Sequence, residues 1–237
     1  KPSSAASDVY KRQPRLTPTE SALMLPGDPG PRARSPGNIA FGAGVFHNGR
    51  VTSLTGRLLV AVPRAHDRDE GDIFTRSVVF VLHHGDDGAQ GVVLTEPLEA
   101  GVDSVLPGWQ SACSAPDRLF QGGPVGLDTA VALAGVPGRG DVVGATRLFG
   151  SLAVVDLDAP PEIVAPQLSG LRVFAGNCGW QPGQLDVELA DGWWVRAEPE
   201  IADLFDADPE TLWARVLARQ PMPTCLLASF PDDPTLN

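Results

Sequence analysis

Residues Ser77–Thr95 read SVVFVLHHGDDGAQGVVLT, and this stretch decides the class of fold. Two runs rich in β-branched residues, Ser77–His84 and Gly91–Thr95, flank the turn Gly85-Asp86-Asp87-Gly88. Asp and Gly favour a reversal of the chain, and β-branched residues favour strands. The stretch therefore predicts a β-hairpin.

Apolar runs bounded by Gly, Pro or Asp predict further strands around the hairpin. Before it, Gly56–Pro63 is an apolar run that ends at a proline, which predicts a buried strand. The polar stretch after it, Arg64–Asp72, predicts a surface loop. Beyond the hairpin lie five strand candidates: Arg118–Gln121, Thr129–Ala134, Val142–Thr146, Leu152–Val155 and Leu171–Ala175.

Helical patterns appear only in the second half of the chain. Asp208–Leu217 begins with an Asp cap followed by proline, and it places Leu212, Trp213, Val216 and Leu217 on one face. Pro161–Leu168 and Pro182–Leu189 are shorter candidates, each with proline at a permitted first position. Strands first and helices later predict an α+β domain rather than a regular alternation of strand and helix.

The first 40 residues differ in composition from the rest. They mix Ser, Pro, Gly and Arg without a hydrophobic period, which predicts disorder. Ser3–Gln13 resembles translated adaptor sequence, so part of this leader is predicted to be non-native. With 43% hydrophobic residues, the chain has enough apolar material for a core. We expect a disordered leader at residues 1–50 and a single domain at residues 51–237.

The sequence also favours a cytoplasmic location. No apolar run approaches the roughly 18 residues that a membrane helix needs, and Lys1–Arg15 lacks the hydrophobic segment of a signal peptide. The cysteines Cys113, Cys178 and Cys225 form no CxxC pair, which favours free thiols in a reducing compartment.

Charge argues against direct nucleic-acid binding. Residues 1–50 hold seven of the 18 basic and three of the 29 acidic residues. Residues 51–237 therefore hold eleven basic and twenty-six acidic residues, a formal net charge of −15. Such a domain repels the phosphate backbone, so we expect a protein partner or a small ligand and neither nucleic acid nor membrane.

Five motifs stand in an order typical of one family: Gly56–Pro63, Phe74–His84, Gly88–Pro97, Gly122–Val125 and Gly176–Leu185. The ending Pro231–Asn237 fits the same family, and the match covers about residues 54–237. The chain therefore resembles the YqgE/AlgH family.

This resemblance implies a cytoplasmic bacterial protein with an α+β fold. A mixed, bifurcated sheet, partly closed as a small barrel, would be surrounded by helices. The family has no established biochemical activity and brings no catalytic residues. Its AlgH name comes from a proposed effect on transcription of alginate biosynthesis genes, which implies a role in transcriptional regulation.

The chain departs from the family pattern at two places. Thr95-Glu96 stands where the family usually has Asn-Arg before the proline, so an anion held by that Arg in relatives would meet a reversed charge here. Asn177-Cys178 stands where Tyr-Ala is common between the glycines.

Gly176–Leu185 is the sharpest local feature, and we interpret it as a glycine-rich turn between a strand and a helix. Helix N-termini attract anions, so the turn could hold a phosphate or carboxylate. It lacks the Lys-Ser/Thr of a P-loop, however, and Asp186 and Glu188 would offset the positive helix end. A purely structural turn is the favoured interpretation.

Cys178 would lie just before that helix, where the dipole lowers a thiol pKa. A nucleophilic or redox role is one hypothesis, and a packed thiol is the favoured one. His83, His84, Asp86 and Asp87 could supply metal ligands, but adjacent strand residues point to opposite faces. We therefore expect one packed and one solvated His and no metal or other cofactor. The charged residues of the Arg64–Asp72 loop, His66 among them, are expected to be solvated.

The tryptophans Trp180, Trp193, Trp194 and Trp213 favour core packing over base stacking in an acidic domain. Trp193 and Trp194 on a short strand would place one ring inside and one on the surface, where it could anchor a partner.

Two functions remain open. The first is a non-enzymatic regulatory or interaction protein, because no complete catalytic set is present and no catalytic residue is assigned. The alternative is a small-ligand-binding protein or a redox or hydrolytic enzyme that uses the Gly176–Gln184 loop, in a groove against the Gly122 motif. Glycine turns let a ligand approach the backbone closely. The candidate ligand or partner surface consists of Gly122, Gly123, Pro124, Asn177, Cys178, Gly179, Trp180 and Gln184.

Overall fold

The structure is a computed structural model of the chain, and it describes residues 53–63, 74–138 and 140–231. The expected leader and the expected loop Arg64–Asp72 lie outside the described residues. The division of the chain into leader and domain therefore stays a prediction.

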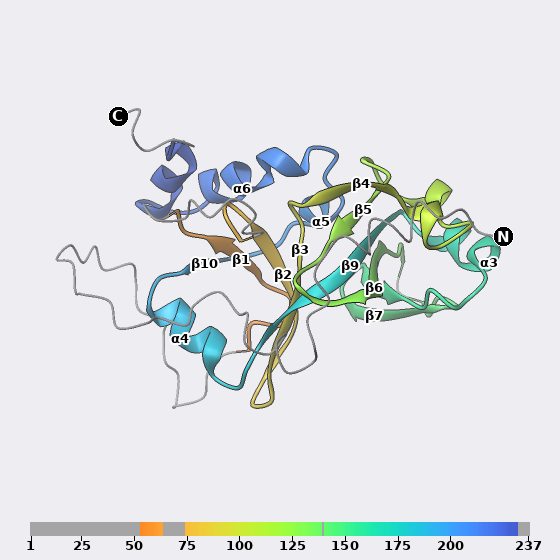
Figure 1. Cartoon of the computed structure of the whole chain (residues 1–237), viewed down its shortest axis with the longest axis horizontal. Coiled ribbons are helices and arrows are strands. Elements are labelled where there is room, and N and C mark those ends of the chain that lie inside the picture. The colour runs from red at the N-terminus through yellow and green to blue at the C-terminus, as the bar shows by residue number, and fades with distance from the viewer. Residues whose placement is uncertain (1–52, 64–73, 139, 232–237) are drawn as a thin grey trace.

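The described residues form ten strands and several short helices (Figure 1). The strands are β1 (Leu58–Ala61), β2 (Val78–Gly85), β3 (Gly88–Val93), β4 (Pro97–Gly101), β5 (Arg118–Gln121), β6 (Val125–Gly135), β7 (Ala145–Phe149), β8 (Leu152–Val155), β9 (Gly170–Trp180) and β10 (Trp194–Ala197). The α-helices are α3 (Pro161–Val164), α4 (Gln184–Ala190), α5 (Ile201–Leu204) and α6 (Pro209–Ala218). The 3₁₀ turns are η1 (Val102–Ser104), η2 (Gln110–Ala112), η3 (Ala165–Gln167) and η4 (Thr224–Ser229). None of the helices in these residues is long and apolar enough to cross a membrane.

Strand β9 joins the two halves of the sheet. The strand order is β10-β1-β2-β3-β9-β6-β8-β7, and β5 pairs with both β4 and β9. The end of β9 pairs with β3, as in Gly91 opposite Cys178, whereas its first part pairs with β6 and, in parallel, with β5. Between β3 and β9 lies Gly122, which accepts a hydrogen bond from the Val93 N–H and donates one to the Ala175 C=O. The sheet therefore branches where β5 enters.

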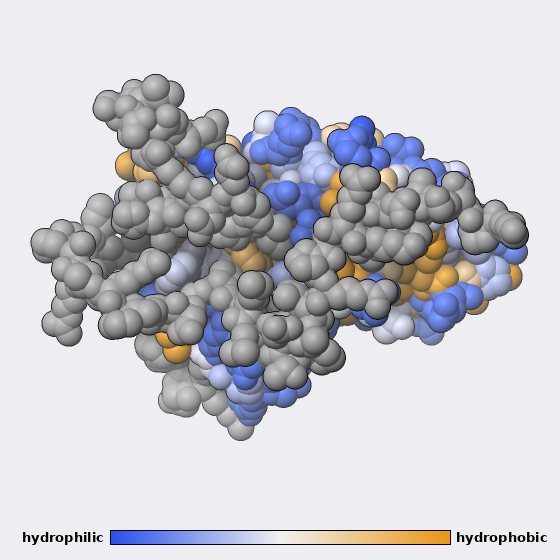
Figure 2. All heavy atoms as spheres, in the orientation of Figure 1, coloured by the Kyte–Doolittle hydropathy of each residue, from blue (hydrophilic) through white to orange (hydrophobic). Residues whose placement is uncertain are grey.

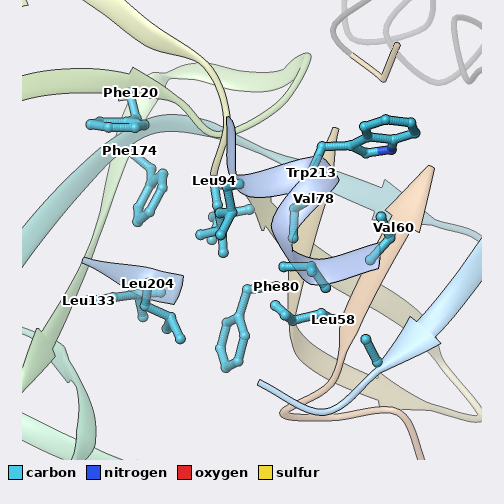
Figure 3. Packing of buried hydrophobic residues seen from close by; sticks show 14 of the residues in the cluster. Leu58, Val60, Val78, Phe80, Leu94, Phe120, Leu133, Phe174, Leu204 and Trp213 are labelled. Carbon is cyan, nitrogen blue, oxygen red and sulfur yellow. The ribbon is translucent and has the colours of Figure 1, made fainter. Parts of the chain in front are cut away.

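The sheet curls until its far strand meets its first half. Phe149 of β7 lies 5.8 Å from Phe80 of β2, ring centroid to centroid, although β3, β9, β6 and β8 separate these strands in the sheet. The concave side is filled by a cluster that includes Leu58, Phe80, Phe174 and residues of α5 and α6 (Figure 3). Trp213 of α6 also donates from Nε1 to the Ala61 C=O at 2.8 Å. The result is a curled, mostly antiparallel half-barrel closed by α5 and α6.

Both faces of the sheet are buried over much of its length. On the convex side, alternate residues of β1–β3 pack with Leu185 of α4, and alternate residues of β6 and β9 pack with Trp109 and Val164. Strands buried on both faces consist of almost uninterrupted apolar runs, which is why the sequence marks them so clearly. The resemblance implies helices around the sheet; the described helices are few and short, and they cover only parts of it.

Most predicted elements are confirmed. β2 and β3 form the predicted hairpin, and β5 and β8 have the predicted bounds. α3 and η3 lie within the predicted stretch Pro161–Leu168, and α4 and α6 each end one residue beyond their predicted stretches. Val142 forms only an isolated bridge, so β7 begins at Ala145 and not three residues earlier.

Among the described strands and α-helices, two were not predicted, each for a local reason. β4 begins with proline and ends with glycine, which are uncommon strand residues. α5 is four residues long and begins at a capping box formed by Glu200 and Asp203, too short for a helical period.

The surface is not uniform. On the face seen in Figure 2, hydrophilic side chains predominate above α5 and α6, whereas hydrophobic ones gather toward the end that carries β6, β7 and α3. Exposed apolar side chains from this end include Val143, Leu148 and Ile163.

Candidate functional site

The structure brings the two glycine motifs of the predicted site into direct backbone contact. A Cβ on Gly122 would lie 2.4 Å from the Gly176 carbonyl oxygen, and one on Gly123 would lie 2.1 Å from the Asn177 carbonyl carbon. Both distances are far inside van der Waals contact. These glycines let β9 pack against the 122–124 segment, and the groove that the enzyme hypothesis requires between the two motifs is filled by backbone.

The interpretation of Gly176–Trp180 as part of a turn is wrong. These residues form the end of β9, and the chain reverses only at Gln181-Pro182-Gly183, where Gly183 is left-handed with φ +75°. Gly176 has φ +69° at an irregularity in the pairing of β6 with β9. A strand that must bulge and pass close to another backbone needs glycine for reasons that resemble those of a turn.

Cys178 consequently lies on a strand and not at a helix start. It is 1% exposed, and its Sγ lies 3.3 Å from the Gly122 carbonyl oxygen, to which the thiol donates. Burial raises the pKa of this thiol well above its ordinary value. The structure therefore favours the packed-thiol interpretation over a nucleophile.

A buried carboxylate network occupies the face of β9 that carries Cys178 and Trp180. Glu188 of α4 is 8% exposed, and its Oε2 accepts hydrogen bonds from Nε1 of both Trp180 and Trp194, each at 2.8 Å. Its Oε1 accepts from Nε2 of Gln184 at 2.9 Å. Three donors thus compensate for the loss of water around this carboxylate.

Sequence reasoning placed Glu188 at a helix start and missed this network. The signal was present, because Glu188 lies three residues after the buried Leu185 and thus on the inward face of α4. Trp194 is buried, as predicted for one of the two adjacent tryptophans. Trp193 is half-buried against the same cluster, so it is not the exposed ring that was expected.

The two histidines differ as predicted. His84 is buried: its Nδ1 accepts from the Leu54 N–H at 3.1 Å, and its Nε2 lies 3.5 Å from Oδ1 of Asp186. His83 is exposed and lies 2.7 Å from Asp87, whose pKa this hydrogen bond lowers. Within the described ranges, no group of three or more His, Cys, Asp or Glu side chains could hold a metal ion.

The position at which the family usually has Asn-Arg is also visible. Thr95 is buried with no hydrogen-bond partner for Oγ1 in the described part of the chain. Glu96 is half-buried, and desolvation raises its carboxyl pKa. The weaker anion binding expected from the reversed charge at this position stays a prediction.

Only part of the predicted surface is accessible. Asn177 and Gly179 alternate with the buried Cys178 and Trp180, so they lie on the opposite face of β9. A Cβ on Gly179 would meet no atom of the described residues within 4 Å, and Gly179 pairs in register with the exposed Gln90 of β3. We call Gln90, Pro124, Asn177 and Gly179 the β9 surface. Gln184 lies on the other side, in the Glu188 network.

The fold and this region define a class of protein: a branched, curled sheet in which a buried Trp–Glu–Trp network joins the end of β9 to α4 and β10. The AlgH-like family model (DUF179) matches residues 58–224. The chain belongs to this family.

Named relatives and solved structures agree with that assignment. A UPF0301 protein of Streptomyces avermitilis is 46% identical over 191 residues, which cover 79% of this chain and 97% of the relative. A UPF0301 protein of Thermobifida fusca is 46% identical over 195 residues, covering 78% and 96%.

The crystal structure of protein DIP2367 from Corynebacterium diphtheriae has a TM-score of 0.68 and 33% identity over 76% of this chain and 94% of that chain. The solution structure of AlgH from Pseudomonas aeruginosa has a TM-score of 0.56 and 24% identity over 79% of this chain and 100% of that chain, and it supports the fold alone.

Proposed function

We propose that this protein is a non-enzymatic regulatory protein of the cytoplasm that acts by binding a protein partner through the β9 surface. One observation carries the proposal: the reactive side chains lie buried on one face of β9, whereas accessible residues lie on the opposite face. On one face, the groups capable of chemistry are buried, and each is hydrogen-bonded within the protein. On the other, Asn177 and Gly179 are accessible next to Gln90.

The β9 surface suits a protein partner better than a small ligand. Asn177 is held over the neighbouring segment by a 3.4 Å contact from its Nδ2 to the Val125 carbonyl, and Gly179 has open space above it. Small-molecule sites are usually concave and enclose most of the ligand. An open, polar strand face fixed by a rigid sheet resembles the rim and contact area of a protein interface.

Charge favours an indirect role in any transcriptional effect. A domain with a formal net charge of −15 repels DNA phosphates, whose neutralisation by Lys and Arg supplies most non-specific affinity. A regulator of this kind acts on a protein that itself binds DNA, or on a protein upstream of it.

The alternative, an enzyme or ligand-binding protein that uses Gly176–Gln184, needs an accessible reacting group there. Cys178 is buried and its pKa is raised, and both oxygens of Glu188 accept hydrogen bonds. Activity from this region would require β9 to separate from the Gly122 motif, which the backbone contact opposes.

Photocrosslinking tests the proposal with a matched pair of positions. Gly179 and Gly140 both have open space for a side chain and neither has a left-handed backbone. A photoreactive amino acid is placed at one or the other in the full chain, expressed in a bacterium that lacks its own family member.

A protein crosslinked from position 179 and not from position 140, whose capture falls when Gln90 is also replaced by Glu, supports the proposal. Equal capture from both positions, or none from position 179, contradicts it. Capture of a metabolite-sized adduct from position 179 would instead favour the ligand-binding alternative.

A further inference from the structure

Arg172 lies inside strand β9 and is 1% exposed. It is in register with Leu133 of β6, and its guanidinium carbon lies 4.2 Å from the centroid of the Phe120 ring. Moving a charged group out of water has a large unfavourable free energy unless an opposite charge and hydrogen bonds replace the water. Contact with the ring offsets only part of this.

Among the described residues, only one nitrogen of this guanidinium has acceptors. Nη2 donates to the carbonyl oxygens of Ala115 at 2.8 Å and Asp206 at 2.7 Å. Nε and Nη1 are buried and have no hydrogen-bond partner among the residues that the structure describes. An Arg side chain can hold a carboxylate with two parallel hydrogen bonds either through Nε and Nη2 or through Nη1 and Nη2. Both arrangements need Nη2, whose hydrogens already bond the two carbonyl oxygens. A ligand here is therefore held through single oxygens.

No described side chain supplies a counter-charge either. Asp206 contributes only its carbonyl, because its carboxylate pairs with Arg215. The Asp117 carboxylate accepts a hydrogen bond from Gln110 at 3.0 Å. Over residues 53–63, 74–138 and 140–231, Arg172 takes part in no ion pair.

Titration does not remove this charge. Burial lowers the pKa of Arg172 to about 10, so the guanidinium stays protonated near neutral pH. Cys113, whose charge would act on Arg172, has its thiol pKa raised to about 11 by burial and by nearby carboxylates. The thiol is therefore neutral at pH 7 and supplies no negative charge.

The guanidinium lies one residue below the surface, between two loops. Of the two residues whose carbonyls accept these hydrogen bonds, Ala115 is exposed and Asp206 is half-buried. These two hydrogen bonds place the guanidinium beneath residues 113–117 and 205–208.

We infer that Arg172 anchors a binding site for a small anion, a carboxylate or phosphate oxygen, beneath residues 113–117 and 205–208. The anion supplies the missing charge, and one of its oxygens accepts the hydrogen bond that Nε now lacks. The Nη1–H groups point in other directions and need a separate acceptor. This site is separate from the β9 surface, so it can be present whether or not a protein binds there.

The test follows the Nε–Hε resonance of Arg172 in the ¹⁵N-labelled full chain at pH 6, during titration with sodium acetate or inorganic phosphate at constant ionic strength. The resonance is assigned by its absence in Arg172→Lys, and the exposed Arg196 serves as the control in the same spectra. Because the titration uses the unaltered protein, the result does not depend on how well the variant folds.

We expect a saturable shift at Arg172 and no saturable shift at Arg196. Saturation by acetate alone points to a carboxylate ligand, and saturation by phosphate alone points to a phosphate. No shift at Arg172, or a linear shift equal to that of Arg196, would overturn the inference and leave buried water as the partner of these donors.

Discussion

A single carboxylate, that of Glu188, ties helix α4 to tryptophans on two different strands. Its two oxygens receive three hydrogen bonds, and the rings of Trp180 and Trp194 meet edge to face at 6.3 Å. An edge-to-face pair adds stability beyond its buried area. The motif is therefore a structural unit in which charge, amide and indoles satisfy one another.

Removing this carboxylate should destabilise the fold strongly. Glu188→Ala leaves two buried indole N–H groups without an acceptor, and we expect a loss of roughly 2–5 kcal/mol in the free energy of unfolding. Glu188→Gln keeps one acceptor oxygen and should lose less. Urea unfolding followed by tryptophan fluorescence measures both variants, with Glu210→Ala on the exposed face of α6 as control. Equal stability of Glu188→Ala and the control would contradict the network.

The three cysteines should react with iodoacetamide at very different rates. Cys178 is 1% exposed and should be alkylated only on unfolding. Cys113 is half-buried with a thiol pKa of about 11, so at pH 8 only about one molecule in a thousand carries the reactive thiolate. Its rate should rise about tenfold from pH 8 to pH 9, because the thiolate fraction grows tenfold per pH unit below the pKa.

Peptide mass spectrometry after timed alkylation separates the three sites, and Cys225 on η4 provides a partly exposed comparison. Rapid labelling of Cys178 in the folded protein would show that β9 opens, and it would restore weight to the enzyme alternative.

At the scale of elements, β9 and the 122–124 segment depend on glycine for their close approach. Gly123→Ala would force a Cβ to 2.1 Å from backbone, at φ +156°, and backbone cannot move aside as a side chain does. We expect a loss of roughly 3 kcal/mol or more, or failure to fold.

The matched control is Gly179→Ala. This glycine lies on β9, near the contact with the 122–124 segment, but it has open space for the new methyl group. Its urea midpoint should stay close to that of the unaltered protein. Similar stability of both variants would mean that the two segments are not in backbone contact.

The same elements show what the sequence could and could not predict. Runs such as Ser77–Leu82 mark their strands because both sheet faces are buried. Gly176–Trp180 was misread as a turn, because local composition cannot distinguish a glycine that turns the chain from one that lets another strand approach. The acceptors around Arg172 come from residues 115 and 206, far apart in the sequence, so no spacing reveals that the residue is buried.

At the scale of the whole molecule, closure of the curl depends on contacts between β7 and the first half of the sheet. Phe149 packs on Phe80, and its ring lies against Gly56, where a Cβ would come within 2.7 Å of Phe149 Cε1. Its neighbour Leu148 has the same 37% exposure and has no aromatic ring to form such a pair.

Replacing each of these neighbours by Ala should therefore have unequal effects. We expect Phe149→Ala to lose roughly 1–3 kcal/mol and Leu148→Ala less than about 1 kcal/mol. Hydrogen exchange of the β7 and β8 amides should also speed up in the first variant only. A larger loss in Leu148→Ala would mean that β7 does not close onto β2.

Strand β9 carries both proposed binding sites, one near Arg172 and the other near Gly179. Arg172 and Gly179 are seven residues apart on β9, roughly 23 Å along one extended backbone. The irregularity at Gly176, where φ is +69°, lies between them, so any influence of one end on the other has to pass this bulge. Thermodynamic linkage requires any such influence to be mutual: if an ion near Arg172 tightens partner association at Gly179 by some factor, the associated partner tightens ion retention by the same factor.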